Sequence, residues 1–499
     1  MKVTTKRMSS LNELLIENAK KGNLEEVKFL VEKGADIHAN NEEAFTMSAW
    51  YGHLDIVKYF VENGANIHIN EDGAFRYSAL NGHFDIVKYL VEKGADIHAD
   101  NEYALRWSAY KGHLDIVKYL EEKGADIHVS RSLQMSAYYG HLDVVKFLVE
   151  KGADIHVNSE LAFWCIASNG HLDVVKFLVE KGADIHINNE SALRGSAHNG
   201  HLDVVKFLVE KGADIHTDNE DALRGSAKHG HLDVVKYLAE KGANIHANNE
   251  GALKWSAHCG HFDIVKYLVE NGADIHTDHV LHQSAYGGHL DIVKYFIEKG
   301  ADIHVDNEGA LRYSANRGHL NVVKFLVDNG ADIHARDDFA LRCSAREGRL
   351  NVVKYLVEKG ANIHADSEGA LRWSAERGHL DVVKYLVEQG ADIHAANECA
   401  LLTSAREGRL SIVKYLIDNG ADINAHNNEV LRESAHHGFL DVVKYLIEKG
   451  ANVLIDFNFE TMNEAIKEFL KKEIKIHKLK INALIYLMND FIKKWLWKP

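Results

Sequence analysis

The five-residue phrase Gly-Ala-Asp-Ile-His, with small variations, recurs along this 499-residue chain at a nearly constant interval. Its first glycine marks 15 units, spaced 30 residues apart except for two spacings of 28: Gly34, Gly64, Gly94, Gly124, Gly152, Gly182, Gly212, Gly242, Gly272, Gly300, Gly330, Gly360, Gly390, Gly420 and Gly450. A period of about 20–50 residues is typical of stacked repeat arrays, in which each unit contacts only its neighbours. The period therefore argues against a single globular core and favours a linear array.

Residues 98–128 show the content of one unit. Asn101, followed by an acid, predicts the N-cap of a short first helix, and Gly112 suits the left-handed residue that ends it. A second helix is expected from about His113 to Gly124, where apolar residues recur at helical spacing. The expected apolar faces are Leu105, Ser108 and Ala109 in the first helix and Leu114, Ile116, Val117 and Leu120 in the second. Neither helix can bury its apolar face alone, so neighbouring units must stack.

Composition limits the compartment and the class of partner. The chain has four widely separated cysteines: Cys165, Cys259, Cys343 and Cys399. Their spacing fits neither a disulfide framework nor a metal motif, so we expect a reducing, intracellular compartment. The polar start of the chain lacks the features of a signal peptide, and no apolar run is long enough to span a membrane. The net charge of −15 disfavours nucleic acid and anionic membranes as partners of the chain body.

The chain resembles the ankyrin-repeat family through two recurring motifs, Gly-His-Leu-Asp-Val-Val-Lys-x-Leu-Val-Glu-Lys-Gly-Ala-Asp-Ile and Ala-Leu-Arg-x-Ser-Ala-x-x-Gly-His. The resemblance covers residues 10–455, between a leader at 1–9 and a basic helical tail at 456–499. It implies an all-α ankyrin-repeat solenoid of stacked helix-turn-helix units, closed by a helical C-terminal cap.

The units depart from the family pattern in two ways. Thr-Pro-Leu-His is replaced by x-Ala-Leu-Arg, and each unit is shorter than the usual ankyrin unit of about 33 residues. The missing residues belong to the loop that forms a projecting β-hairpin finger in ankyrin proteins. The resemblance therefore implies stunted fingers, most of all around Ser130–Leu133 and Asp278–Leu281. Proline-free units of this length are similar to those of very large DNA viruses of protists.

One face of the first helix varies between units. Counting back from the glycine of Gly-His, positions −7, −4 and −3 repeat as Leu, Ser and Ala and are expected in the core, whereas positions −9, −6, −5 and −2 share the opposite face. In the family these variable positions line a concave groove that binds partner proteins, and Trp and Tyr dominate binding hot spots. The candidate partner-binding residues are Trp50, Tyr51, Tyr77, Trp107, Tyr110, Tyr138 and Tyr139. The alternative is that these rings pack against neighbouring repeats.

Arginines and histidines recur as well. Position −6 carries Arg76, Arg106, Arg194, Arg224, Arg312, Arg342, Arg372 and Arg432. An acid stands four residues before most of these arginines, which favours intrahelical ion pairs over a nucleic-acid groove. Thirteen histidines end the Gly-Ala-Asp-Ile-His phrase and eleven follow the glycine of Gly-His. Because stacked helices lie about 8–10 Å apart, equivalent histidines cannot share a metal ion, and we expect turn and capping roles.

Residues 461–499 form a basic tail whose nine lysines and four acids give a charge of +5. Two helices are expected there, the first with Met462, Ile466, Phe469 and Leu470 and the second with apolar residues from Leu484 to Leu496. One interpretation is a cap that seals the last repeat. Resemblance to viral ankyrin proteins with an F-box-like end implies recruitment of ubiquitin ligase machinery, although this tail lacks the Leu-Pro opening. A third interpretation is membrane contact through Lys493, Lys494, Trp495 and Trp497.

No Ser-His-Asp order, phosphate loop or carboxylate pair stands outside the repeat pattern, so we expect no enzymatic activity, cofactor or metal site. The sequence predicts a monomeric scaffold that binds partner proteins through the concave face of the array and does not bind nucleic acid. The alternative functions are a ubiquitin-ligase adaptor acting through the tail, and a structural or membrane-peripheral component.

Overall fold

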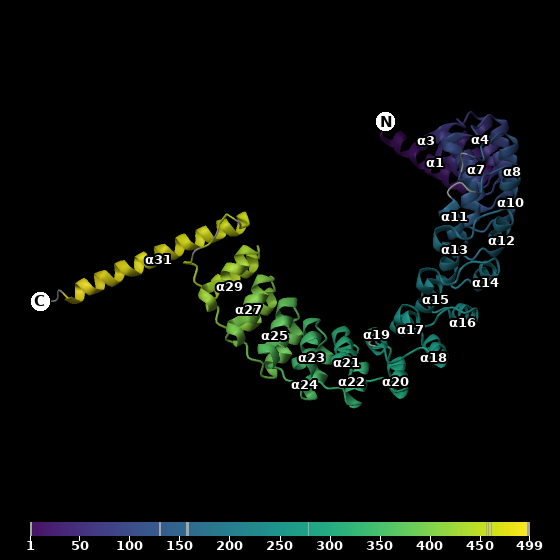
Figure 1. Ribbon diagram of the computed structural model, residues 1–499. Coiled ribbons are helices and arrows are strands. Elements are labelled where there is room, and N and C mark those ends of the chain that lie inside the picture. Colours follow the sequence, from purple (N-terminus) through teal and green to yellow (C-terminus); the bar gives the residue numbers. More distant parts are fainter. Residues whose placement is uncertain are drawn as a thin grey trace. The chain divides into compact units, whose positions relative to one another are not determined.

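A computed structural model of the chain describes residues 2–128, 131–155, 159–277, 279–455, 457, 459–460 and 462–496 (Figure 1). Within these residues the chain forms 31 α-helices and no β-strand, which confirms the all-α expectation. The helices belong to two units, residues 1–248 and 249–499. The segments between one repeat and the next, where ankyrin proteins have β-hairpin fingers, are short turns in the described residues. Ser130 and Asp278, in the shortest of the expected fingers, lie outside the described residues.

The helices form 15 pairs followed by a single long helix. The first helices of the pairs are α1 (Lys2–Lys21), α3 (Ala39–Trp50), α5 (Ile69–Leu80), α7 (Ala99–Lys111), α9 (Ser132–Tyr138), α11 (Ser159–Ser168), α13 (Ile187–His198), α15 (Thr217–His229), α17 (Ala247–Cys259), α19 (Val280–Gly287), α21 (Val305–Arg317), α23 (Ala335–Arg346), α25 (Ala365–Arg377), α27 (Ala395–Arg406) and α29 (Ala425–His436). The second helices are α2 (Leu24–Glu32), α4 (Leu54–Glu62), α6 (Phe84–Glu92), α8 (Leu114–Glu122), α10 (Leu142–Glu150), α12 (Leu172–Glu180), α14 (Leu202–Glu210), α16 (Leu232–Glu240), α18 (Phe262–Glu270), α20 (Leu290–Glu298), α22 (Leu320–Asp328), α24 (Leu350–Glu358), α26 (Leu380–Glu388), α28 (Leu410–Asp418) and α30 (Leu440–Glu448). The long helix is α31 (Glu464–Leu496).

Each repeat buries a similar set of small and branched side chains between its two helices. In α7 and α8 these residues include Leu105, Ser108, Ala109, Ile116, Val117 and Leu120. Leu114, which the apolar pattern placed in the core, is only half-buried because it opens α8 beside the turn. The Ser108 hydroxyl donates a hydrogen bond to the Leu105 carbonyl at 3.1 Å, so burial leaves no unpaired hydroxyl there.

The first helices determine how neighbouring repeats pack. They contact each other more extensively than the second helices do. The serine and alanine at positions −4 and −3 are small and buried, which lets these helices approach closely. Within each unit the first helices therefore line the inner side of the curve and the second helices the outer side (Figure 1).

The turn before most of the first helices, including α7, differs from the expected N-cap at Asn101. Asp100, Asn101 and Glu102 all adopt left-handed backbone conformations, with φ of 50°, 56° and 60°. The regular part of α7 begins after Glu102. Left-handed backbone is unfavourable for residues other than glycine, although Asn and Asp tolerate it best. Three such residues in succession therefore need compensating contacts.

A buried carboxylate supplies those contacts. Glu102 is 4% exposed, and its Oε1 accepts a hydrogen bond from His98 Nδ1 at 2.6 Å and from the Asp126 backbone N–H of the next repeat at 3.1 Å. The same pair of histidine and acid recurs as His38–Glu42, His68–Asp72, His186–Glu190, His216–Glu220, His304–Glu308, His334–Asp338, His364–Glu368 and His394–Glu398. One carboxylate thus closes its own turn and joins it to the next repeat.

The sequence predicted an ion pair between the acid at the Glu102 position and the arginine four residues later. That prediction is wrong. Arg106 Nη2 instead donates to the Asp100 carbonyl oxygen at 2.9 Å. Arg342 Nη1 reaches Asp366 Oδ2 of the next repeat at 2.7 Å, while its Nη2 donates to the Arg336 carbonyl at 2.8 Å. These arginines therefore stabilise the left-handed turns by hydrogen bonds to their carbonyl groups. The carboxylate of Glu102 is instead hydrogen-bonded to His98.

The histidines of Gly-His cap the preceding repeat, which confirms the capping interpretation. His113 Nε2 donates to the Leu80 carbonyl at the end of α5, 3.2 Å away. Equivalent bonds join His53 to Lys20, His83 to Trp50, His141 to Tyr110, His171 to Tyr138, His201 to Ser168, His231 to His198, His289 to His258 and His319 to Tyr286. Each bond satisfies a carbonyl that has no partner within its own helix.

The two ends of the chain differ from the sequence-based expectations. Helix α1 already begins at Lys2, so residues expected to form a leader are helical. The tail forms one continuous helix, α31, in place of two. Four residues were expected to contact a membrane. Trp497 lies outside the described residues, and so do the side chains of Lys493, Lys494 and Trp495. Among the described helices, none is both long and apolar enough to cross a bilayer.

Replacing Glu102 with alanine removes the acceptor that holds the Asp126 N–H and the His98 ring. We expect the free energy of unfolding to fall by about 1–3 kcal/mol, the usual range for a lost buried partner. Urea denaturation followed by circular dichroism measures this change. Glu122→Ala, at the exposed end of α8, is the matched control and should change stability by less than about 0.5 kcal/mol. Equal effects of the two substitutions would contradict the role assigned to Glu102.

His98 and His113, one from each histidine series, should respond to pH in opposite directions. The hydrogen bond to Glu102 raises the pKa of His98, so its contribution to stability is complete below about pH 6.5 and is lost as pH rises through the folded-state value. Burial lowers the pKa of His113, so its contribution is present above about pH 6.5 and is lost as pH falls. Urea midpoints from pH 5 to pH 9 should show the His98→Gln deficit shrinking, and the His113→Gln deficit growing, with rising pH. Parallel pH profiles would contradict this assignment.

Candidate protein-binding face

Four of the seven candidate residues form one aromatic cluster on neighbouring first helices of residues 1–248. The cluster consists of Trp107, Tyr110, Tyr138 and Tyr139. The ring centroids of Trp107 and Tyr110 are 5.0 Å apart, and those of Tyr110 and Tyr139 are 4.3 Å apart. Tyr138 and Tyr139 follow at 4.8 Å. All three contacts are edge-to-face, the favourable geometry for aromatic rings.

The other three candidates lie on the preceding repeats. Trp50 of α3 and Tyr77 of α5 form a second edge-to-face pair at 5.0 Å. Tyr51 follows the end of α3 and is 51% exposed. The structure therefore groups the seven residues as a four-ring cluster, a pair and an exposed tyrosine.

Tyr103 belongs to the same face but is absent from the candidate set. Its ring lies 5.5 Å from Trp107, and the Arg76 guanidinium lies 4.8 Å from the ring centroid. Tyr103 stands at position −9, one of the variable positions, so its place in the pattern could have identified it. It extends the aromatic surface from α7 toward α5.

The cluster both packs against neighbouring repeats and remains accessible. Tyr138 and Tyr139 are 40% and 44% exposed although each has a ring neighbour. The hydrogen bond with Tyr110 raises the pKa of the Tyr139 phenol, and burial raises that of Tyr103. These hydroxyls are therefore neutral near pH 7 and can donate hydrogen bonds. Rings held by their neighbours lose little conformational entropy when a partner binds.

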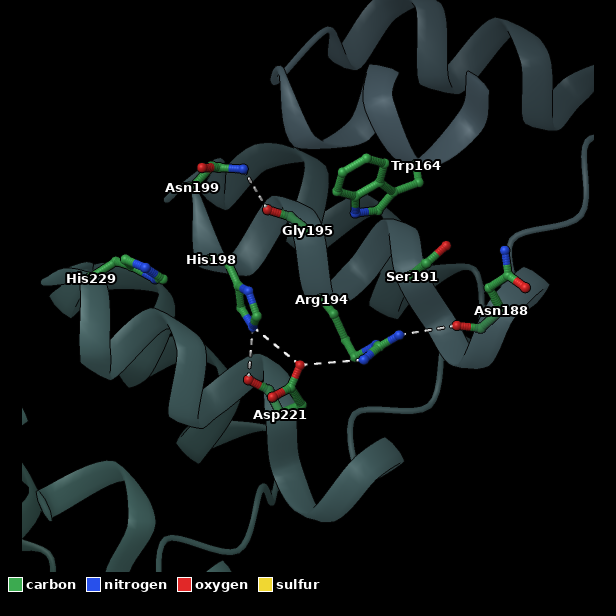
Figure 2. Close-up of a pocket in the computed structure, with 9 residues that line it drawn as sticks. All are labelled: Trp164, Asn188, Ser191, Arg194, Gly195, His198, Asn199, Asp221 and His229. Carbon is green, nitrogen blue, oxygen red and sulfur yellow. Dashed lines mark hydrogen bonds and ion pairs between the residues drawn. The ribbon is translucent and has the colours of Figure 1, made fainter. Parts of the chain in front are cut away.

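A hollow of about 500 Å³ lies further along the first helices, on α11, α13 and α15 (Figure 2). Its lining is Trp164, Asn188, Ser191, Arg194, Gly195, His198, Asn199, Asp221 and His229. Trp164 is 40% exposed and stands at position −6, where most repeats carry arginine. At position −5, where Tyr77, Trp107 and Trp255 stand in other repeats, this part of the chain has Gly195 and Gly225. Of these two glycines, Gly195 lines the hollow.

The two glycines also allow close contacts between repeats. A Cβ atom on Gly195 would lie 2.0 Å from Ser168 Oγ and 2.6 Å from Trp164 Nε1. A Cβ on Gly225 would lie 1.8 Å from His198 Cδ2. Because each glycine has no side chain, a side chain of the preceding repeat can pack directly against the helix that contains the glycine.

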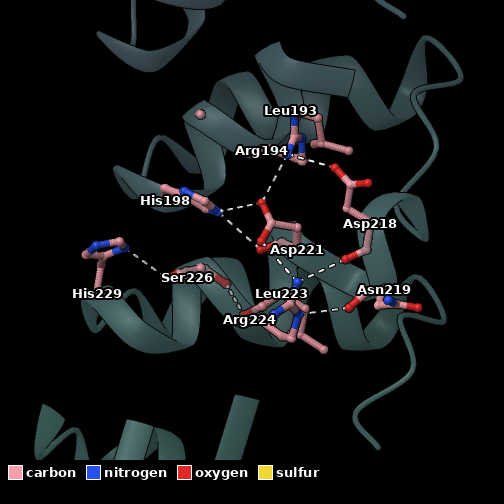
Figure 3. A network of polar contacts seen from close by, with 12 residues as sticks. Leu193, Arg194, His198, Asp218, Asn219, Asp221, Leu223, Arg224, Ser226 and His229 are labelled. Carbon is pink, nitrogen blue, oxygen red and sulfur yellow. Dashed lines mark hydrogen bonds and ion pairs between the residues drawn. The ribbon is translucent and has the colours of Figure 1, made fainter. Parts of the chain in front are cut away.

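Asp221 organises the polar wall of the hollow (Figure 3). Its carboxylate lies 3.2 Å from His198 Nε2, 3.5 Å from Arg194 Nη1 and 3.2 Å from Arg224 Nη2. Arg194 also pairs with Asp218 at 2.9 Å. Because the arginines are held by carboxylates and backbone carbonyls, this wall offers polar contacts without a free cluster of positive charge.

Residues 249–499 carry a second aromatic group that the candidate set does not contain. The rings of His258 and Tyr286 stack at 5.5 Å, and the Arg317 guanidinium lies 4.6 Å from the Tyr286 centroid. Tyr313 lies 6.2 Å from Tyr286 and is 39% exposed. A small cavity of about 180 Å³ is lined by His279, His282, Gln283, Tyr286 and Tyr313. Tyr286 and His258 occupy position −2, the position that also identified Tyr110 and Trp50.

The sequence model of the family described as "Ankyrin repeats (3 copies)" matches residues 10–71, 70–131, 133–219, 197–279, 276–337, 336–397 and 371–456. The chain belongs to the ankyrin-repeat family. Ankyrin repeats are generally protein–protein interaction modules and are typically not enzymes. Comparison with curated proteins gives no match. In the described part of this ankyrin-repeat protein, no group of three or more His, Cys, Asp or Glu residues is placed to hold a metal ion.

Gly225→Ala should destabilise the protein although alanine is the better helix former. The added Cβ displaces the His198 ring and breaks its contact with Asp221, so we expect a loss of about 1 kcal/mol. Gly73→Ala is the matched control, because a Cβ there meets its nearest neighbour at an ordinary 3.4 Å. The control should leave stability unchanged or raise it by up to about 1 kcal/mol. Urea denaturation measures both variants, and a stabilising Gly225→Ala would contradict the close contact.

Proposed function

We propose that this ankyrin-repeat protein is a non-enzymatic scaffold that binds partner proteins through the inner face of its first helices. The observation that carries the proposal is the cluster of Trp107, Tyr110, Tyr138 and Tyr139, which combines exposed aromatic area with rings fixed by their neighbours. Tryptophan and tyrosine contribute most of the binding energy in many protein interfaces. Preorganised rings add affinity because less side-chain freedom is lost on binding.

The partner chemistry follows from the neighbouring features. The hollow beside Trp164 suits a projecting side chain with an aromatic body and a polar end, which would contact both Trp164 and the polar wall and anchor the partner next to the cluster. Residues 1–460 carry a charge of −20, so long-range attraction favours partners with basic surfaces around the anchor. The arginines of position −6 are engaged by the protein itself, which supports a protein partner over a nucleic acid.

The compartment is part of the same proposal. None of the four cysteines, all of which lie in the described residues, forms a disulfide. Burial raises the pKa of the Cys343 thiol to about 12, so this thiol is unreactive. Cysteines without disulfides fit a reducing, intracellular location. A monomer is the form in which the inner face of each unit is open to other proteins.

The double substitution Tyr138→Ala/Tyr139→Ala should remove partner binding without unfolding the array. Both side chains are exposed, so circular dichroism should be unchanged. Affinity capture from lysate identifies binders of the unaltered chain, and titration of a purified binder should show an affinity loss of about tenfold or more. Phe29→Ala is the matched control, because Phe29 is 48% exposed on the second helix α2.

The comparison of these variants shows whether partners bind to the inner face, formed by the first helices, or to the outer face, formed by the second helices. Binders lost only with the tyrosine substitutions support the inner face. Binders lost with Phe29→Ala and retained by the tyrosine variant would contradict it. Ligase components that persist in the tyrosine variant would instead point to recruitment through the tail.

A further inference from the structure

The long helix α31 exposes more apolar surface than any other helix that the structure describes. Nine apolar side chains between residues 479 and 492 are 41–75% exposed: Leu479, Ile481, Leu484, Ile485, Tyr486, Leu487, Met488, Phe491 and Ile492. A contiguous exposed apolar surface marks an interaction site in a soluble protein.

Only the beginning of α31 is covered by the protein itself. The side chains of Met462, Ile466 and Leu470 are buried. The helix that carries Ile466 and Leu470 contacts α30. From residue 478 to residue 489 every side chain is exposed. The start of the helix therefore caps the last repeat, and the remainder is free to bind something else.

The exposed part of the helix is amphipathic. Ile481, Leu484, Met488 and Phe491 follow one another at spacings of three and four residues and so lie on one face. Ile485 and Ile492 widen that face on one side. Lys475, Lys478, Asn482 and Asn489 lie along the flank of that face next to Ile485.

Positive charge is concentrated immediately before the apolar segment. Residues 471–480 contain five lysines and one acid, whereas residues 481–492 contain one acid and no basic residue. All five lysines, Lys471, Lys472, Lys475, Lys478 and Lys480, are exposed. This basic segment contrasts with residues 1–460, whose charge is −20.

We infer that the exposed part of α31 is a membrane anchor that lies on the surface of an anionic lipid bilayer. An apolar face beside a cluster of lysines is the pattern of a helix whose apolar side chains enter the headgroup boundary while its lysines contact acidic headgroups. The apolar segment 481–492 is about 18 Å long at 1.5 Å per residue, too short to span a hydrocarbon core of about 30 Å. The anchor therefore lies along the surface and does not cross it.

A second copy of the chain fits the observations less well. In a parallel pair of α31 helices, the two segments 471–480 would each bring a charge of +4 to the same place. The apolar residues also extend beyond the seam of a two-stranded coil to Ile485, Leu487 and Ile492, which would stay in water. An acidic lipid surface neutralises the lysines and covers the wide apolar face together.

The test is co-sedimentation of the full chain with vesicles of phosphatidylcholine alone and with vesicles that also contain phosphatidylserine. We expect binding to the phosphatidylserine vesicles, weakened by added salt, and little binding to phosphatidylcholine alone. Leu484→Glu/Phe491→Glu should abolish binding, and Lys475→Gln/Lys478→Gln should weaken it by about tenfold or more. Phe29→Glu, at an exposed aromatic residue of the repeat array, should bind as the unaltered chain does. The substituted residues are exposed, so circular dichroism should be the same for all variants.

Three results would overturn the inference. The first is equal binding to the two kinds of vesicle, which would remove the role of the lysines. The second is full binding by Leu484→Glu/Phe491→Glu. The third is the absence of vesicle binding together with self-association in analytical ultracentrifugation that Leu484→Glu/Phe491→Glu abolishes, which would assign the surface to a second copy of the chain.

Discussion

A buried carboxylate in the turn before many of the first helices holds neighbouring repeats of this array together. In the repeat that contains α7, Glu102 accepts hydrogen bonds from His98 of its own turn and from the Asp126 N–H of the next. Without those bonds, the three left-handed residues that precede α7 would be an unfavourable way to start a helix. The acid thus links local backbone strain to the stacking of neighbours. The histidine of Gly-His adds a second bond between repeats, from the opposite end of the first helix.

The candidate binding face depends on this regular stacking. Because the first helices of neighbouring repeats are held at a fixed separation, Tyr110 and Tyr139 meet with their ring centroids 4.3 Å apart although 29 residues separate them in sequence. Where position −5 is glycine, the same separation lets Trp164 and His198 lie against the next helix. A constant frame with variable residues on one face is a means of building a specific surface from similar units.

The features that recur in every unit could be predicted from the sequence. The features that depend on contacts between units could not. The period, the helix pairs and the buried Leu, Ser and Ala of each first helix follow from spacing alone. The N-cap at Asn101 was wrong because Asp100, Asn101 and Glu102 adopt left-handed backbone conformations, which the bonds of Glu102 to His98 and to the Asp126 N–H stabilise. The expected break in the tail does not exist, since neither glycine nor proline interrupts residues 464–496. The hollow was missed because its lining comes from three successive first helices, α11, α13 and α15, whose side chains the repeat pattern does not place relative to one another.

Hydrogen–deuterium exchange of the full chain, with and without a purified partner, tests the central claim most directly. If the partner binds the inner face, amide protection should rise in the first helices α7 and α9 and in the loops beside them. The second helices α8 and α10 should be unaffected, since they lie on the other side of the same repeats. Protection confined to second helices, or to α31, would contradict the account.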